Sequence, residues 1–508
     1  MQQTQAELRP ERGIPRYATE TIGRAGAIDE IGRLLARSCL ATIVGPGGIG
    51  KTRIATEVAR ADESRATAFV DLEPIRDPQL VVSTVAAAVG ADLGGTSDPE
   101  MALANLLGQQ SMLLVLDNCE HVLRPVSSLC RALLAHCSRL RILATSREAF
   151  GIDGESVFVV GALDDGASVR LFIERAGERA DAFSKSPSDL AVITQVCRRL
   201  DGIPLAIELA AARIDGLTPE ELLASLKERF RLLNKNKSEA KNPHHRTLRA
   251  LIDWSYDLLS EEERTAFTRL GVFRGEFSRD AAREVIGTGV DLDVLARKSL
   301  IAASIGAQDR FRMYESMREY AILHLHVSDA EPARRAHAVF FANLAAAAAS
   351  DFGTVPEDVW LSRYLPDLDN FRTALSWMQR CDLTLGAATI GDLKELWFHG
   401  NLSYEGLSRS QMIVAALRPD DDRALGPLLA VASLAWRVGE FKVSYEAAKR
   451  AATIAERTNN ARAIAQARYS IGWALFKLGD TEQALPALRL AVDEYRALDE
   501  PLRTLLVE

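Results

Sequence analysis

Residues 45–52 form a glycine-rich loop whose residue types suit the binding of phosphate groups. They read Gly-Pro-Gly-Gly-Ile-Gly-Lys-Thr and fit the P-loop pattern G-x-x-x-x-G-K-[ST]. Glycines let successive backbone N–H groups turn inward around phosphate oxygens, and a following helix adds the positive end of its dipole. The loop therefore predicts ATP or ADP as ligand, with Mg²⁺. The loop residues expected to bind nucleotide are Gly45, Pro46, Gly47, Gly48, Ile49, Gly50, Lys51 and Thr52.

The segments on either side of this loop fit the same interpretation. The apolar run Leu40–Val44 favours a strand before it, and Thr52–Arg60 favours a helix after it. Lys51 is expected to reach the β- and γ-phosphates, and Thr52 to bind Mg²⁺. An ordinary glycine-rich turn is the alternative, but strand, loop, Lys-Thr and helix in this order favour a nucleotide site.

A second segment, Met112–Asp117, predicts a buried strand that ends in a carboxylate. Asp117 at the strand end is expected to hold Mg²⁺, while capping of the next helix is the alternative. The next residue is Asn118, where many NTPases have a second acid. Glu120 and His121 are the available substitutes for a catalytic base, and surface roles for them stay open. We therefore expect slow hydrolysis.

A further strand, Leu143–Arg147, ends in two hydroxyl residues and an arginine. A strand next to the P-loop strand would place Arg147 near a γ-phosphate, where a guanidinium can bind two oxygens at once. A surface salt bridge is the alternative. The catalytic candidates are Lys51, Asp117, Glu120 and Arg147, and the metal ligands are Thr52 and Asp117.

Composition indicates an ordinary globular protein of several domains. The chain has 508 residues, of which 47% are hydrophobic and 26% charged, and its net charge is −8. These values predict roughly three or four domains and argue against a chain that is basic throughout. Its six cysteines include no C-x-x-C pair, which favours reduced thiols. No signal peptide and no apolar run of membrane-spanning length is visible, so we expect a cytoplasmic location and no membrane partner.

The alternation of patterns along the chain predicts a multidomain fold. Strands and helices alternate up to about residue 160, which favours a parallel sheet covered on both faces. Helical periodicity follows, then helices with short strands, then helices alone. The predicted domains are a flexible lead (1–20), an α/β nucleotide-binding domain (21–160), a small helical domain with a linker (161–240), a domain of three helices and short strands (241–327) and an all-α array (328–508).

The last of these regions contains an internal repeat. Trp397, Trp436 and Phe476 are 39 and 40 residues apart, and each is followed by a glycine three residues later. This spacing indicates stacked helical hairpins of the tetratricopeptide kind, with helices longer than in the 34-residue form. Unrelated helices with chance spacing are the alternative.

Taken together, these motifs resemble the STAND class of signal-transduction ATPases. The closest group is that of bacterial ATPases related to NB-ARC proteins that carry tetratricopeptide repeats, many of them transcriptional regulators. The matching segments are Ile22–Arg24, residues 45–52, 113–121, 143–148, 200–211, 246–259 and 310–321. The resemblance implies that 241–327 is a winged-helix domain. It also implies a switch in which ADP holds a closed form and ATP with a signal opens it.

The resemblance also assigns roles to individual residues. Gly23 and Arg24 would lie by the adenine and ribose, Arg53 would belong to the nucleotide site, and Pro204 would pack on the adenine. Met313-Tyr314-Glu315 stands where relatives have Met-His-Asp, whose histidine touches the β-phosphate of ADP. Tyr314 can still donate a hydrogen bond there, and Tyr314 and Glu315 are expected to hold the closed packing.

Three functions are compatible with these features. The first is a switch that senses a protein or small-molecule signal through its repeats and forms a homo-oligomer. The second is a regulator that binds DNA directly through its winged helix, supported by the basic stretch Lys227–Arg249, which we read instead as a solvated linker. The third is an ATPase motor, against which Asn118 argues. The first is favoured.

Overall fold

The chain forms two compact units in the computed structural model. The residues described are 14–17, 19–75, 77–91, 93, 98–108, 110–177, 187–214, 217–226, 243–287, 289–304 and 309–498. Residues 1–78 and 107–333 make up the first unit, and residues 79–106 and 334–508 the second. The predicted linker at 234–242 lies outside the described residues.

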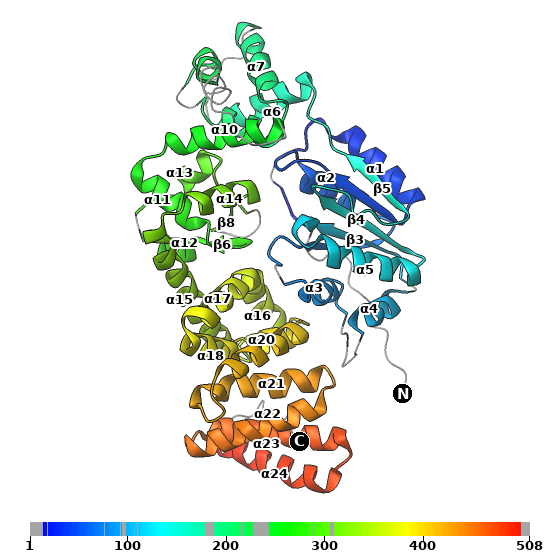
Figure 1. Cartoon of the computed structure of the whole chain (residues 1–508), viewed down its shortest axis with the longest axis vertical. Helices are drawn as coiled ribbons and strands as arrows, with labels where there is room; N and C mark the ends of the chain where they lie inside the picture. Colours follow the sequence, from blue (N-terminus) through cyan, green and yellow to red (C-terminus); the bar gives the residue numbers. More distant parts are fainter. Residues whose placement is uncertain are drawn as a thin grey trace. The chain divides into compact units, whose positions relative to one another are not determined.

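The first unit contains a five-stranded parallel sheet with the strand order β2-β3-β4-β1-β5 (Figure 1). Its strands are β1 (Leu40–Val44), β2 (Ala66–Asp71), β3 (Met112–Asp117), β4 (Leu140–Ser146) and β5 (Glu155–Val159). The predicted α/β domain with a parallel sheet is confirmed. Every residue of β3 is buried, as expected for a central parallel strand.

The register of this sheet determines which side chains meet at its carboxyl edge. In β1 and β4, Val44 pairs with Ser146, and in β2 and β3, Asp71 pairs with Asp117. Strand β4 lies between the strand that enters the P-loop and the strand that ends in Asp117. The helices of this domain are α1 (Ala25–Arg37), α2 (Lys51–Ala61) and α5 (Leu123–His136), with a short 3-10 helix η1 (Cys119–His121).

Helices and a small sheet make up the rest of the first unit. The first helices are α6 (Asp165–Gly177), α7 (Pro187–Arg199) and α8 (Pro204–Ala211). They are followed by α10 (Pro243–Asp257), α11 (Glu261–Leu270), β6 (Glu276–Ser278), α12 (Arg279–Ile286), α13 (Leu292–Arg297), β7 (Ala302–Ala303), β8 (Arg310–Arg312) and α14 (Glu315–His324). The three strands form an antiparallel sheet with the order β6-β8-β7. A reciprocal capping box of Ser260 and Glu263 begins α11, as its sequence predicts.

The second unit is helical and includes two helices that the sequence assigns to the nucleotide-binding domain. These are α3 (Leu80–Ala88) and α4 (Pro99–Leu107), which lie between β2 and β3 along the chain. The remaining helices are α15 (Val327–Asp351), α16 (Glu357–Tyr364), α17 (Leu368–Cys381), α18 (Leu383–Asp392), α19 (Lys394–His399), α20 (Ser403–Ala416), α21 (Leu425–Arg437), α22 (Phe441–Arg457), α23 (Ala461–Leu478) and α24 (Thr481–Ala497). Helix α15 begins in the first unit and continues into the second.

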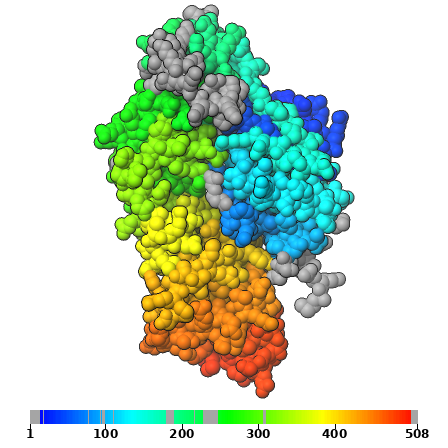
Figure 2. All heavy atoms as spheres, viewed as in Figure 1, coloured from blue at the N-terminus to red at the C-terminus, as the bar shows by residue number. Residues whose placement is uncertain are grey.

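Helices α21 to α24 form two hairpins that match the predicted repeat. Gly439 and Gly479 have φ values of 84° and 89°, a left-handed conformation that suits glycine at the end of a helix. At the third position, Asn401 (φ 59°) takes the left-handed conformation in place of Gly400. Trp397 is buried, whereas Phe476 is 47% exposed. In Figure 2 the side chains of these helices, orange to red, pack into one continuous body.

Two predictions from composition concern the chain as a whole. The six cysteines are free thiols; Cys119, Cys130, Cys137 and Cys197 are buried, and Cys39 and Cys381 are exposed. Within the described part of the chain, no helix has both the length and the apolar character needed to cross a bilayer.

Candidate functional site

The P-loop connects β1 to α2 with the backbone that its glycines allow. Gly48 and Gly50 have φ values of 75° and 98°, and Gly50 precedes the first residue of α2. At Gly48 a side chain would also meet Leu205 and Leu248, at 3.1 and 3.2 Å from the added Cβ. The loop therefore needs glycine there for its conformation and for the close approach of other segments.

Lys51 lies inside this loop. Its ammonium donates hydrogen bonds to the carbonyl oxygens of Gly45 (2.9 Å) and Pro46 (3.3 Å). Burial lowers the pKa of Lys51, while the carboxylates of Glu120 and Asp117 oppose that shift. The side chain is thus a buried cation at the loop, as a phosphate-binding lysine requires.

Asp117 and Thr52 are in direct contact. The Thr52 hydroxyl donates to Asp117 Oδ1 (3.0 Å), and the Thr145 hydroxyl on β4 donates to the same oxygen. Burial raises the pKa of Asp117, and the two hydroxyl hydrogen bonds oppose that shift. One carboxylate and one hydroxyl suit Mg²⁺, which commonly takes few protein oxygens and completes its shell with phosphates and waters. These residues therefore fit the expected metal.

Asn118, Glu120 and His121, which follow Asp117, have different partners. The Asn118 side chain donates to Asp71 (3.5 Å), and His121 Nε2 contacts the carbonyl oxygen of Ile75 (2.8 Å). Glu120 Oε1 accepts a hydrogen bond from Arg147 Nε (3.0 Å). Its second carboxylate oxygen is buried and has no hydrogen-bond partner among the described residues. The charge of the Glu120 carboxylate also raises the pKa of Lys51.

Arg147 follows β4 directly and is paired on two sides. Besides Glu120 it contacts Glu319 on α14, with 3.3 Å between Arg147 Nη2 and Glu319 Oε1. Arg147 is also close enough to lower the pKa of Lys51. The sheet thus brings Arg147 to the edge at which the P-loop begins, which we call the phosphate end of the domain, and there it takes part in ion pairs.

Residues near the start of the domain hold the P-loop in place. The Arg24 guanidinium is buried and donates to the carbonyl oxygens of Ile49 (3.0 Å) and Gly161 (2.9 Å). Gly23 has a φ of 68°, and a Cβ there would lie 2.4 Å from Ala167. Arg53 donates to the Thr21 hydroxyl (2.7 Å), and its guanidinium lies 4.1 Å from the centre of the Tyr17 ring. Tyr17 therefore contacts α2, although its sequence suggests a flexible lead.

Helix α8 reaches the P-loop through its first turn. Pro204 is its first residue, and the Leu205 N–H donates to the Gly48 carbonyl oxygen (3.2 Å). A proline at this position begins a helix without losing a hydrogen bond. The helical segment therefore contacts the loop through a backbone hydrogen bond and a leucine side chain.

Tyr314 immediately precedes α14 and lies beside Arg312. The Arg312 guanidinium is 5.4 Å from the centre of the Tyr314 ring, and it also lies 5.2 Å from the ring of Tyr17. Burial, with a contribution from Glu208, raises the pKa of Tyr314.

The side chain that reaches the P-loop from this segment is Ser316, which sequence reasoning missed. A Cβ added to Gly47 would lie 3.1 Å from the Ser316 hydroxyl oxygen. A polar residue in the first turn of a helix, just after the Met-Tyr-Glu segment, was the available signal.

One face of α14 thus contacts the ends of three strands of the parallel sheet. Ser316 lies against the loop after β1, Arg318 pairs with Glu73 after β2 (3.0 Å), and Glu319 pairs with Arg147 after β4. Burial and the carboxylates of Glu73, Glu120 and Glu319 raise the pKa of Glu315 to about 7, while Arg147 opposes that shift. We call Ser316, Arg318, Glu319 and Glu315 the α14 face.

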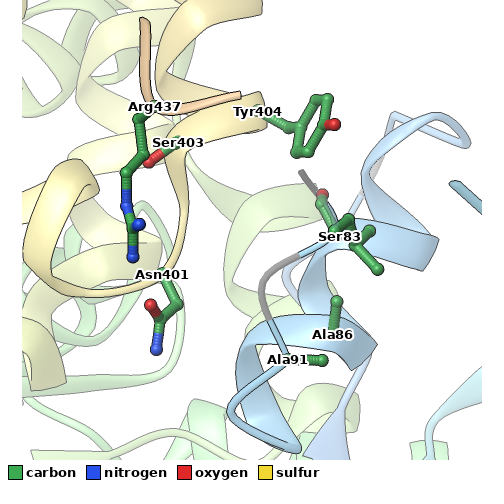
Figure 3. A pocket seen from close by; sticks show the side chains of 8 residues that line it. Ser83, Ala86, Ala91, Asn401, Ser403, Tyr404 and Arg437 are labelled. Atoms are coloured by element: carbon green, nitrogen blue, oxygen red, sulfur yellow. The ribbon is translucent and has the colours of Figure 1, made fainter. Parts of the chain in front are cut away.

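A small opening in the second unit lies between α3 and the helices α20 and α21. Figure 3 shows Ser83, Ala86 and Ala91 on one side, with Asn401, Ser403, Tyr404 and Arg437 on the other. Its volume of about 10 Å³ holds a single water, which is far too little for a nucleotide. We therefore place the candidate nucleotide site at the P-loop.

The chain is similar to known proteins in sequence and in fold. No protein family profile matches the chain. A Mycobacterium tuberculosis protein named "Putative HTH-type transcriptional regulator" is 38% identical over 389 residues, 74% of this chain and 44% of that protein. A second M. tuberculosis protein, named only as uncharacterized, is 34% identical over 327 residues, 62% of this chain and 83% of that protein. The chain therefore spans less than half the length of the first relative.

A solved structure has a similar fold over nearly the whole chain. It is a STAND protein with a tetratricopeptide repeat sensor from Pyrococcus horikoshii, with a TM-score of 0.51 and 14% identity. The match covers 99% of this chain and 81% of that protein. At this level of identity the likeness concerns the fold alone.

Proposed function

We propose that this chain, which belongs to the STAND class of signal-transduction ATPases in its transcriptional-regulator-associated group, is a switch between ADP-bound and ATP-bound states. One observation carries the proposal. The P-loop that would hold the phosphates is also the loop that α8 and α14 contact, through Leu205 and Ser316. A ligand there would interact differently with different placements of these helices, which is the requirement for a population shift.

In this proposal the nucleotide binds at residues 45–52. Lys51 binds the β- and γ-phosphates, Thr52 and Asp117 hold Mg²⁺, and the metal ion neutralises phosphate charge. Arg24 keeps the loop in shape through its hydrogen bond to the Ile49 carbonyl oxygen. Gly23 and Arg24 lie by the base and ribose, Pro204 packs on the base, and Arg53 and Tyr314 belong to the same nucleotide site.

The direct test of nucleotide binding is calorimetric titration of ADP and of a non-hydrolysable ATP analogue with Mg²⁺. Lys51→Ala removes a charge-assisted contact, so affinity should fall by about 1.5–3 kcal/mol. Mass spectrometry of nucleotide released on denaturation of the purified protein should identify ADP. Unchanged affinity in a folded Lys51→Ala protein would refute the site.

Hydrolysis at this site should be slow. Asn118 cannot act as a general base, and the carboxylate of Glu120 is paired with Arg147. Steady-state turnover should lie below about 1 s⁻¹, the low end of typical enzymes. If Glu120 is the base, Glu120→Gln lowers turnover and leaves binding intact.

The other domains take the sensing and output roles. We assign α10–α14 and the β6-β8-β7 sheet to a winged-helix domain, and residues 328–508 to a repeat array that binds a protein or small-molecule signal. Residues 79–106 join β2 to β3 along the chain and yet belong to the second unit. This connection supports transmission of a signal from the array to the nucleotide domain, followed by homo-oligomer formation.

Direct DNA binding by the winged helix is the second candidate. The name of one relative, "Putative HTH-type transcriptional regulator", favours it. The basic stretch at 227–249 lies mostly outside the described residues. A gel shift titrated with salt decides between the two, because binding through phosphate contacts weakens steeply as salt rises.

A further inference from the structure

Arg147 is held between two carboxylates that come from different parts of the first unit. Its Nε atom is 3.0 Å from Glu120 Oε1, in the 3-10 helix after β3. Its Nη2 atom is 3.3 Å from Glu319 Oε1, on α14. One partner therefore belongs to the nucleotide domain, and the other to a helix that follows the small antiparallel sheet.

The position of Arg147 in the sheet places it at the phosphate end of the domain. It follows Ser146, which pairs with Val44, the last residue before the P-loop. The preceding Thr145 shares Asp117 with Thr52. A guanidinium at this position is a second cation, besides Lys51, for a third phosphate.

The two carboxylate partners differ in how easily they can be displaced. The Glu120 side chain is 13% exposed and sits on the rigid sheet domain, whereas the Glu319 side chain is 50% exposed on α14. A half-exposed ion pair contributes little, whereas a phosphate offers more charge and several acceptor oxygens to a guanidinium. ADP has no γ-phosphate, so it does not compete with Glu319 for Arg147.

We propose that Glu319 is a specificity-determining residue that favours ADP over ATP, because it holds Arg147 in competition with the γ-phosphate. This inference rests on the proposed nucleotide switch. ATP gains its contact with Arg147 only when the Glu319 carboxylate gives it up, and α14 then loses one of its contacts with the sheet. The second contact, Arg318 with Glu73, remains.

The test compares nucleotide affinities of the full chain with Glu319→Gln, measured by titration of ADP and of a non-hydrolysable ATP analogue with Mg²⁺. The variant keeps the shape of the side chain and removes its charge. The ratio of the ATP-analogue Kd to the ADP Kd should fall about two- to fivefold, the range of an exposed ion pair. Glu284→Gln, which removes an exposed carboxylate from α12, should leave the ratio unchanged.

A double-mutant cycle separates the specific pair from a general effect of charge. In an Arg147→Ala background, Glu319→Gln should not change the ratio further. The inference is wrong if Glu319→Gln alone leaves the ratio of the two Kd values unchanged. It is also wrong if Glu319→Gln lowers this ratio equally in the wild-type and Arg147→Ala backgrounds. A failure of the proposed nucleotide site gives a different result. In that case Lys51→Ala would leave the affinities for ADP and for the ATP analogue unchanged, with either Glu or Gln at position 319.

Discussion

Arginine–glutamate clusters occur in both units of the chain, and they are built in opposite ways. In the repeat array, Glu405 on α20 is fully buried and accepts hydrogen bonds from Arg372 (2.8 and 2.5 Å) and Arg409 (2.8 Å). Burial opposes ionisation there, but these two arginines lower the pKa of Glu405 to about 2. At the α14 face, burial and the neighbouring carboxylates instead raise the pKa of Glu315 to about 7.

The difference lies in burial and in the signs of the neighbouring charges. Arg372 and Arg409 surround the Glu405 carboxylate, and Arg372 also pairs with Asp369. Burial and the carboxylates of Glu73, Glu120 and Glu319 raise the pKa of Glu315, whereas Arg147 and Lys51 oppose that shift. A buried, fully paired cluster resists any change of geometry, because separating the charges leaves them unsolvated. At the α14 face, the Glu319 side chain is half-exposed, so its ion pair with Arg147 can separate more easily. We infer that the first cluster holds a scaffold and that the second belongs to a contact that changes.

The largest expected effect comes from breaking the paired cluster. Glu405→Gln removes the carboxylate that Arg372 and Arg409 share and leaves Arg372 paired with Asp369, so the second unit should lose about 3–5 kcal/mol of unfolding free energy. Urea unfolding followed by tryptophan fluorescence measures this loss, because Trp397 on α19 packs against Gly406, the residue after Glu405 on α20. A loss below about 1 kcal/mol would mean that the two clusters do not differ as described.

The same cluster predicts a loss of stability in acid. The pKa of Glu405 is lowered in the folded chain, so its contribution is present above the ordinary glutamate pKa and is lost as pH falls toward about 2. Wild-type stability of the second unit should therefore decline between about pH 4.5 and 2, and Glu405→Gln should flatten that part of the curve.

A smaller effect should follow from removing the anchor of α14. Arg318→Ala leaves the buried Glu73 with Arg274, at 3.7 Å, as its ion-pair partner among the described residues. The loss of one charge-assisted hydrogen bond, about 1.5–3 kcal/mol, should loosen α14 and speed the release of a fluorescent ADP analogue. Arg283→Ala on α12, an exposed arginine, serves as the control. Equal release rates in all three proteins would show that α14 does not hold the nucleotide.

The smallest effect concerns pH and Glu315. Because the pKa of Glu315 is raised in the folded chain, its contribution to α14 docking is full below about pH 4.5 and is lost as pH rises through about 7. The charged groups that act on it are Glu73, Glu120, Glu319 and Arg147, and Lys51 is also within range. Nucleotide release should therefore speed up from pH 6 to 8, and Glu315→Gln should remove that dependence. If the wild-type protein releases nucleotide at the same rate from pH 6 to 8, this prediction is wrong.

Local patterns predicted the sheet domain well because they are set by neighbouring residues. The P-loop glycines, the buried run before Asp117 and the strand before Arg147 each depend on a short segment, and parallel pairing then brings their ends together. The order of the strands, with β4 between β1 and β3, is set by tertiary packing and comes from the structure.

The contacts made by α14 could not be predicted in the same way. Ser316, Arg318 and Glu319 meet residues more than 170 positions away, so no local pattern reveals their partners. The resemblance drew attention to Tyr314, but its ring lies beside Arg312, and Ser316 is the side chain at the P-loop. Sequence reasoning also expected Glu315 to hold the closed packing; burial and the neighbouring carboxylates raise its pKa to about 7, which makes any such contribution depend on pH.

The most direct test of the switch is hydrogen exchange of the backbone amides, with ADP and with a non-hydrolysable ATP analogue and Mg²⁺. The α14 amides, residues 315–324, should exchange more slowly with ADP than with the ATP analogue, because the γ-phosphate competes for Arg147. The amides of α20, around Glu405, should exchange at the same rate in both states. Equal protection of α14 with the two nucleotides, both shown to be bound, would contradict the account.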